Sequence, residues 1–296
     1  MGDLSSLEEL VIEAPSLERL GDSVGGLQSL RGMWIKNAKK LKGLPEDFGQ
    51  LSALRILEIY DADELQSLPD SFSFPKSLLE LELKSCKLER LPRNVVDLSS
   101  LEELVIEAPS LESLGDNVGG LQSLRGMWIK KSSKLKRLPD NFGNLSSLEV
   151  LIIESRSMKS LPESMRQLHS LKAMGLALGE SVKSVLVGIE RIPSLQEFGF
   201  DCDGHEETPN IFGGISCSAR RLFLTGALGG FGSISSLTAL SLVEFPLLET
   251  LPDDVGTLSS LERLTIEDCE MLESLPESLG HVSSLKEIRL ESLARD

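Results

Sequence analysis

The residues able to do chemistry in this chain are few and widely spaced. The three histidines, His169, His205 and His281, lie far apart in the sequence. No phosphate-binding loop, nucleophile elbow or paired-histidine motif occurs. The carboxylates, Glu80 and Glu82 among them, are numerous enough to be ordinary solvated surface charge. The sequence therefore predicts a protein that is not an enzyme and uses no cofactor.

The four cysteines predict neither a metal site nor a disulfide framework. Cys202 and Cys217 flank His205, but their spacing matches no zinc site, and a fourth ligand would have to be an acid. Cys86 and Cys269 occupy equivalent places in the repeat described below and are expected to be buried structural thiols. Cysteines spread in this way are typical of a reducing, cytoplasmic setting.

The charge of the chain narrows the class of partner. The formal net charge is -16 at pH 7, and the acidic residues are spread along the whole sequence. Phosphates would be repelled, so nucleic acid and anionic membrane surfaces are disfavoured. No apolar run is long enough to span a membrane. A protein or peptide with a basic or mixed-charge surface is the expected partner.

An internal repeat of 23 or 24 residues supplies the elements that must position the polar residues. In residues 98–120, Leu104 and Ile106 are two apart, which is the period of a strand. Leu111 and Leu114 are three apart, which suits a short helical or 3₁₀ segment on the return side. Each unit is therefore expected to be a strand, a bend, a return segment and a second bend.

The same frame recurs about 12 or 13 times over residues 1–296. A proline follows the second leucine of the return segment in many units, where its fixed φ suits the start of a helical turn. Units of 24 residues have one residue more than units of 23, and in the regular units this extra residue always falls in the bend after the strand. No unit buries its leucines alone, so the units must stack into one α/β solenoid with a parallel sheet along one face.

This frame resembles the leucine-rich-repeat consensus L-x-x-L-x-L-x-x-N/C-x-L, which Leu78, Leu81, Leu83, Cys86 and Leu88 match in full. Residues 261–285 also resemble repeats of plant intracellular resistance receptors of the nucleotide-binding type, and plant Ras-group repeat proteins are similar. The resemblance implies a horseshoe whose concave face carries the sheet and binds the partner. The Asn/Cys position often holds another residue, so an asparagine ladder is not expected to stabilise the stack.

Because side chains alternate along a strand, the residues between the buried leucines are expected to face outward from the sheet. Both tryptophans and the only tyrosine fall on this face. Exposed aromatic residues are typical anchors of binding sites, although a tryptophan can also simply cover the leucines beneath it. The predicted binding residues are Trp34, Lys36, Glu58, Tyr60, Glu82, Glu103, Glu107, Trp128, Lys130 and Phe223.

Residues 3–36 recur almost unchanged at 97–130, an offset of 94 residues or four units. The two copies differ only at Arg19 and Ser113 and at Ser23 and Asn117. One interpretation is an internal duplication without functional meaning. The other is a ligand that is contacted twice, by Trp34 and by Trp128.

Residues 177–233 break the rhythm of the repeat, and the polar segment 201–214 is a candidate recognition loop. Decay of a repeat explains the same irregularity. No polar cap is visible at either end, which predicts a fragment of a larger protein or an array whose ends associate with something, including each other.

The sequence thus predicts non-catalytic protein or peptide recognition, in a plant immune sensor if the finer resemblance holds. Three alternatives remain open: an autoinhibitory region of a larger signalling protein, a stand-alone intracellular scaffold of the Ras-group kind, and an enzyme with its active site in the 201–217 loop.

Overall fold

The computed structural model of the chain describes residues 4–21, 23–68, 73–179, 189, 192–202, 221–225, 230–231, 234–243, 245 and 248–291. The chain divides into two compact units. The N-terminal unit comprises Met1–Ser157 and Pro162–Ser170, and the C-terminal unit comprises Met158–Leu161 and Leu171–Asp296. Each unit is a solenoid in its own right. A single solenoid over residues 1–296 stays a prediction.

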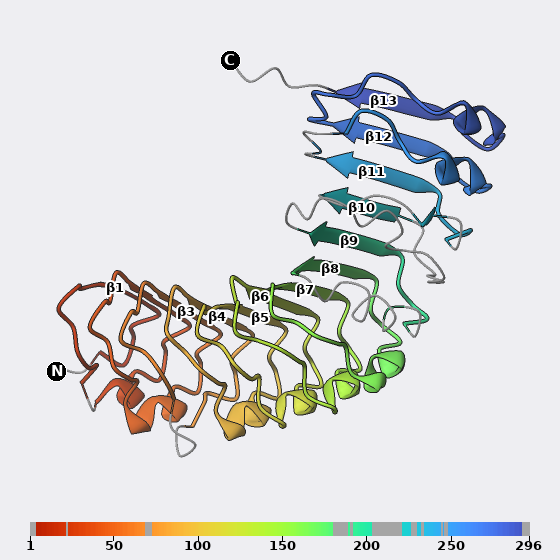
Figure 1. Cartoon of the computed structure of the whole chain (residues 1–296). Helices are drawn as coiled ribbons and strands as arrows, with labels where there is room; N and C mark the ends of the chain where they lie inside the picture. The colour runs from red at the N-terminus through yellow and green to blue at the C-terminus, as the bar shows by residue number, and fades with distance from the viewer. Residues whose placement is uncertain are drawn as a thin grey trace. The chain divides into compact units, whose positions relative to one another are not determined.

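Parallel strands, each hydrogen-bonded to the next along the chain, build the sheet of the N-terminal unit (Figure 1). They are β1 (Glu9–Glu13), β2 (Gly32–Lys36), β3 (Ile56–Tyr60), β4 (Glu80–Lys84), β5 (Glu103–Glu107), β6 (Gly126–Lys130) and β7 (Val150–Ser155). The register is in phase with the repeat, so that Glu9, Gly32 and Ile56 lie side by side in the first position of β1, β2 and β3. The predicted strands and their parallel order are confirmed.

The C-terminal unit repeats this plan. Its strands are β8 (Ala173–Leu178), β9 (Glu197–Cys202), β10 (Arg221–Thr225), β11 (Ala239–Val243), β12 (Arg263–Glu267) and β13 (Glu287–Glu291). Strands β9 and β10 fall within the irregular stretch 177–233 and still pair in register, Phe223 opposite Gly199. Of the predicted loop 201–214, Asp201 and Cys202 end strand β9 and the other residues lie outside those described.

The return side of each unit carries 3₁₀ helices. In the N-terminal unit they are η1 (Val24–Gly26), η2 (Glu46–Gln50), η3 (Arg93–Asp97), η4 (Val118–Gly120), η5 (Phe142–Asn144) and η6 (Glu163–Gln167); η8 (Asp253–Thr257) and η9 (Glu277–His281) belong to the C-terminal unit. Leu111 and Leu114, whose spacing predicted such a segment, lie outside them: η4 begins at Val118, and Ser113 forms an isolated β-bridge with Arg90. A proline stands immediately before η2, η3, η6, η8 and η9 with an extended backbone. Its carbonyl accepts the first N–H bond of the turn, as from Phe48 to Pro45.

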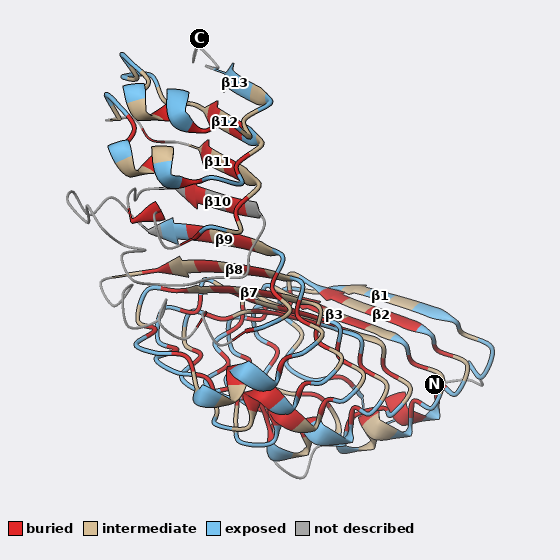
Figure 2. Ribbon diagram, turned by 90° about the vertical axis from the view of Figure 1, so that its right-hand side faces the viewer, coloured by how far each residue is buried: buried red, intermediate tan, exposed pale blue. Residues whose placement is uncertain are grey.

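Buried residues, most of them aliphatic, recur along the strands and return segments of each unit (red in Figure 2) and make up its core. Leu54 before the strand, Leu57 and Ile59 on it, and Leu65 after it are all fully buried in one unit. Phe48 and Phe142 add two aromatic rings to the core of the N-terminal unit. Because each leucine contacts the units on both sides, stacking provides the burial that no single repeat achieves.

Hydrogen bonds between consecutive units take the place of an asparagine ladder. The Ser123 and Ser170 hydroxyls donate to the carbonyls of Ser99 and Ser146 in the preceding unit, and the Ser77 hydroxyl donates to the Leu54 carbonyl at 2.7 Å. Ser194 and Ser284 do the same in the C-terminal unit. In these five units the serine before the leucine that precedes the strand therefore links neighbouring units.

The bends after the strands use left-handed backbone. Asn37, Asp61, Ser85, Lys131 and Asp268 all have φ between 49° and 53°. Asparagine and aspartate tolerate this region better than other non-glycine residues do. The chain reverses here, which is why the bend accepts one residue more or less without disturbing the strands.

Two remaining expectations concern the thiols and the membrane. Cys86 is buried, as predicted, and burial raises the pKa of its thiol. Cys269 is partly exposed, so the prediction that it is buried was wrong: its unit is less covered at that bend. Among the described residues, no helix has the length and hydropathy needed to cross a membrane.

Candidate functional site

The first, third and fifth residues of strands β1 to β7 point away from the core and form what we call the outer face of the N-terminal unit. Three rows cross this face from strand to strand, because the register is in phase. The middle row reads Val11, Trp34, Glu58, Glu82, Val105, Trp128 and Ile152. The last row contains Lys36, Tyr60, Lys84, Glu107 and Lys130. The predicted binding residues outside β10 thus share one surface.

A glycine makes room for each tryptophan. A Cβ atom on Gly32 would collide with the Trp34 indole, and one on Gly126 would collide with the Trp128 indole in the same way. Each ring therefore folds back along its own strand over the glycine two residues earlier. Both tryptophans are partly exposed. They cover the sheet, and they also leave apolar ring surface open to a partner.

The surroundings of the two rings differ. Trp34 lies between Val11 and Glu58 in the middle row, whereas Trp128 lies between Val105 and Ile152. The first ring therefore borders a carboxylate and the second has apolar neighbours on both sides. A partner would meet two chemically distinct aromatic sites on the same face.

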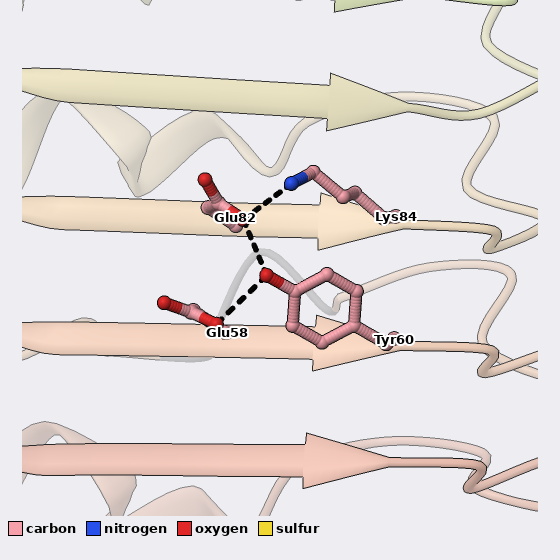
Figure 3. Close-up of polar contacts among 4 residues, drawn as sticks. All are labelled: Glu58, Tyr60, Glu82 and Lys84. Atoms are coloured by element: carbon pink, nitrogen blue, oxygen red, sulfur yellow. Dashed lines mark hydrogen bonds and ion pairs between the residues drawn. The ribbon is translucent and has the colours of Figure 1, made fainter.

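Four polar side chains between the tryptophans form a hydrogen-bonded cluster on β3 and β4 (Figure 3). The Tyr60 hydroxyl oxygen lies 2.7 Å from Glu58 Oε2 and 2.6 Å from Glu82 Oε2. Lys84 Nζ donates to Glu82 Oε2 at 2.6 Å and lies 5.1 Å from the Tyr60 ring centroid. Glu82 is therefore a fixed member of a network, and the expectation that it is ordinary solvated charge was wrong.

Burial and hydrogen bonding perturb this cluster. Burial raises the pKa of Tyr60, and its contacts with Glu82 and Glu58 raise it further, so the hydroxyl keeps its proton. Burial also raises the pKa of Glu82, but the hydrogen bonds from Lys84 and Tyr60 outweigh it and lower the pKa overall. Glu82 is consequently ionised at neutral pH and holds Lys84 over the tyrosine ring.

Glu80 and Glu103 form a second pair of carboxylates in the first row. They occupy directly opposed positions on β4 and β5. Burial raises the pKa of Glu80, and the negative charges of Glu103, Glu58 and Glu82 raise it further. Sequence reasoning placed Glu80 on this face without singling it out. Its importance depends on which residues the neighbouring strands bring beside it, which no single repeat reveals.

The other predicted residues are placed as follows. Lys36 and Lys130 end strands β2 and β6, with Lys36 exposed and Lys130 partly exposed. Glu107 pairs with Lys131, whose Nζ lies 2.7 Å from Glu107 Oε1. Phe223 lies on β10 of the C-terminal unit, and its side chain is outside the described part of the structure. The structure thus brings nine of the ten candidates onto the outer face of the N-terminal unit and leaves Phe223 on the other unit.

Similarity to known proteins is restricted to the fold. No protein-family model matches the chain, and no curated protein matches it in sequence. A leucine-rich-repeat protein of Leptospira interrogans has a similar structure, with a TM-score of 0.63 and 22% identity over 94% of this chain and 71% of that one. A chain of the Drosophila Toll–Spatzle complex is similar with a TM-score of 0.69 and 17% identity, over 96% of this chain and 41% of that one.

The repeat, the parallel strands and these likenesses define the class: the protein has the leucine-rich-repeat fold. The chain spans less than half the length of the Drosophila chain that it matches.

Proposed function

We propose that this protein is a non-catalytic recognition module that binds a protein or peptide on the outer face of the N-terminal unit. The observation that supports it most is the gathering of both tryptophans and the only tyrosine on that face, none of them fully buried. Large rigid aromatic side chains dominate binding energy at protein interfaces. Here a fixed sheet presents them, so little conformational entropy is lost on binding.

Charged residues around the aromatic groups supply the selectivity. Glu58, Glu82, Glu103 and Glu107 lie on the same face as Lys36 and Lys130. Electrostatic complementarity of this kind suppresses wrong partners and fixes register more than it adds affinity. Carboxylates outnumber lysines on this face, so the preferred partner surface is basic or mixed.

One complex of a structurally similar protein agrees with this proposal. The similar Drosophila chain was solved in a complex of Toll with Spatzle. The resemblance of residues 261–285 to plant resistance receptors supports a more specific proposal, in which the partner is sensed inside a plant cell. The free thiol of the buried Cys86 agrees with a reducing, cytoplasmic setting.

Two other roles use the same face. In an autoinhibitory role the partner is a signalling module of the same polypeptide, and in a scaffold role it is a separate protein. A gene product that joins these repeats to a nucleotide-binding module would favour the first.

Affinity capture from the native source tests the proposal. We expect Trp34→Ala/Trp128→Ala to lose proteins that the parent chain retains, because the two anchors of the face are gone. A matched control is Val96→Ala/Met271→Ala, which removes exposed apolar side chains elsewhere in the chain. If the tryptophan and control variants retain the same proteins as the parent, recognition does not use this face.

Intrinsic fluorescence separates the two tryptophans, because they are the only ones in the chain. Trp34→Phe leaves Trp128 as the reporter, and Trp128→Phe leaves Trp34. A purified partner that contacts both copies should change the emission of both single-tryptophan proteins. A change in one alone would show that the duplicated sequence is not contacted twice.

A further inference from the structure

The strip of the outer face between the two tryptophans is strongly acidic. Glu58 and Glu82 oppose each other in the middle row, and Glu80 and Glu103 oppose each other in the first row. Like charges directly opposite each other on neighbouring strands are destabilising. Strands β3, β4 and β5 nevertheless place two such pairs in contact, flanked by Trp34 on β2 and Trp128 on β6.

The cluster lacks hydrogen-bond donors. A tyrosine hydroxyl has one proton, yet the Tyr60 oxygen lies within hydrogen-bonding distance of both Glu58 and Glu82. Lys84 donates to Glu82, so Glu58 is the carboxylate left short of a donor. Within the described ranges, no ion pair reaches Glu80 or Glu103. The strip would accept two or more further N–H donors that carry positive charge.

The geometry points to a basic peptide and not to a metal ion. Among the residues described, no three His, Cys, Asp or Glu side chains come close enough together to hold a metal. The carboxylates are spread over three strands, so a long and planar donor matches them better than a point charge. Arginine presents five donors in a fixed fork and also stacks on aromatic rings.

We propose that the outer face of the N-terminal unit binds an extended peptide segment across its strands, with an arginine seated on Glu58, Glu80 and Glu103 and an apolar residue over each tryptophan. This inference rests on the proposed function and adds the chemical class of the partner. The face is an unpartnered sheet surface, and charge complementarity identifies its occupant.

Strand spacing fixes the pattern of the peptide. Four strand intervals of about 4.8 Å separate β2 from β6, so the two indoles lie about 19 Å apart. An extended peptide rises about 3.3 Å per residue, so the two apolar residues should be about six positions apart. The carboxylates lie between them, and side chains on one side of an extended peptide recur every second position, so the arginine should stand about two positions from one apolar residue and about four from the other.

Selection from a library of random twelve-residue peptides displayed on phage, with the full chain immobilised, provides the probe. We expect enriched peptides to carry an arginine with an apolar residue about two positions to one side and about four positions to the other. A synthetic copy of the most enriched peptide, labelled for fluorescence anisotropy, is then titrated with the parent and with Glu80→Gln/Glu103→Gln. The variant should bind at least about tenfold more weakly, since hydrogen bonds between charged groups are lost.

Controls separate this effect from general charge and from misfolding. Glu46→Gln/Glu89→Gln removes the same charge from exposed positions on the return side and should bind like the parent. Glu80→Gln/Glu103→Gln relieves repulsion, so its midpoint of thermal unfolding should equal or exceed that of the parent. Replacing the peptide arginine by neutral citrulline should weaken binding to the parent more than binding to this variant, in which Glu58 alone still faces the arginine.

Three outcomes would overturn the inference. Peptides that need Trp34 and Trp128 but contain no basic residue, or that bind Glu80→Gln/Glu103→Gln normally, refute the basic peptide and leave the proposed function standing. Peptides that bind equally well without the tryptophans and without these carboxylates refute both. If no peptide is enriched over the empty support, an extended peptide is not the occupant, while capture of a folded partner still tests the proposed function.

Discussion

The two copies of the duplicated sequence, residues 3–36 and 97–130, fold alike but lie in different surroundings. Among the described strands, β1 of the first copy pairs with β2 only, whereas β5 of the second copy pairs with β4 and β6. Val11 is 62% exposed and its equivalent Val105 is 7% exposed. The difference shows that the neighbouring strands, and not the repeat itself, decide what a given side chain does in this array.

The largest difference should appear in the core. Leu104 is fully buried, while its equivalent Leu10 is partly exposed. Leu104→Ala should lower the free energy of unfolding by about 3–4 kcal/mol, and Leu10→Ala by about half as much, because less contact area is lost there. Urea unfolding followed by circular dichroism measures both. Equal losses would show that the two copies are equivalent in the core.

On the outer face, equivalent substitutions in the two copies should differ by up to about 2 kcal/mol in their effect on the free energy of unfolding. Val105→Asp places a carboxylate between Glu82 and Trp128, where it is desolvated and repelled. We expect it to lower the free energy of unfolding by about 2 kcal/mol, against less than about 0.5 kcal/mol for Val11→Asp at the exposed site. A large loss from Val11→Asp would contradict the exposure of that residue.

Removing a negative charge from the second copy should instead raise the free energy of unfolding, by an amount that depends on pH. Glu103 opposes Glu80, whereas its equivalent Glu9 opposes Gly32. Glu103→Gln should therefore stabilise the fold by about 0.5 kcal/mol at pH 7, and Glu9→Gln should have no effect.

The sign of the pH effect follows from Glu80. Burial and the charge of Glu103 raise the pKa of Glu80 in the folded state, so folding stability falls as the pH rises from the ordinary glutamate value to this raised value. Near pH 4 Glu80 is largely protonated and the benefit of Glu103→Gln should vanish. Thermal unfolding midpoints at pH 4 and pH 7 test this. A benefit of equal size at both values would exclude charge repulsion as its cause.

The smallest expected effect concerns the residue that follows each copy. Asn37 and Lys131 both have left-handed backbone, with φ of 50° and 49°. Asn37→Lys should cost about 0.5 kcal/mol, because lysine tolerates this region less well than asparagine does. A new ion pair with Glu13, like that of Lys131 with Glu107, would offset part of this cost. Thermal unfolding at low and at 1 M salt separates the two contributions, since only the ion pair is screened.

Much of the fold was predictable because one simple pattern recurs. The two-residue spacing of Leu104 and Ile106 predicted a strand, and the observed β5 contains both residues. The outward residues of every strand followed from alternation. The serine bonds between units were missed, because Ser77 and its equivalents look like ordinary loop residues until the preceding carbonyl lies 2.7 Å away.

The sequence predicted which residues share the outer face, but it did not predict which of their side chains contact one another. Trp34, Tyr60 and Glu82 were placed on one face from sequence, yet nothing in the repeat indicated that Tyr60 bridges two carboxylates on different strands. Gly32 and Gly126 gave a usable signal, since each stands two residues before a tryptophan. That spacing puts the small residue and the ring on the same side of the strand.

By itself the sequence determined the α/β solenoid, the position of each strand and the side of the sheet on which every residue lies, because these depend on local periodicity. Tertiary structure alone decided which side chains meet across strands. Contacts such as Glu80 with Glu103, or Trp128 with Val105, join residues about one repeat apart, and stacking in register creates them. The acidic strip between two tryptophans that stand in nearly identical sequence is therefore a property of the stack.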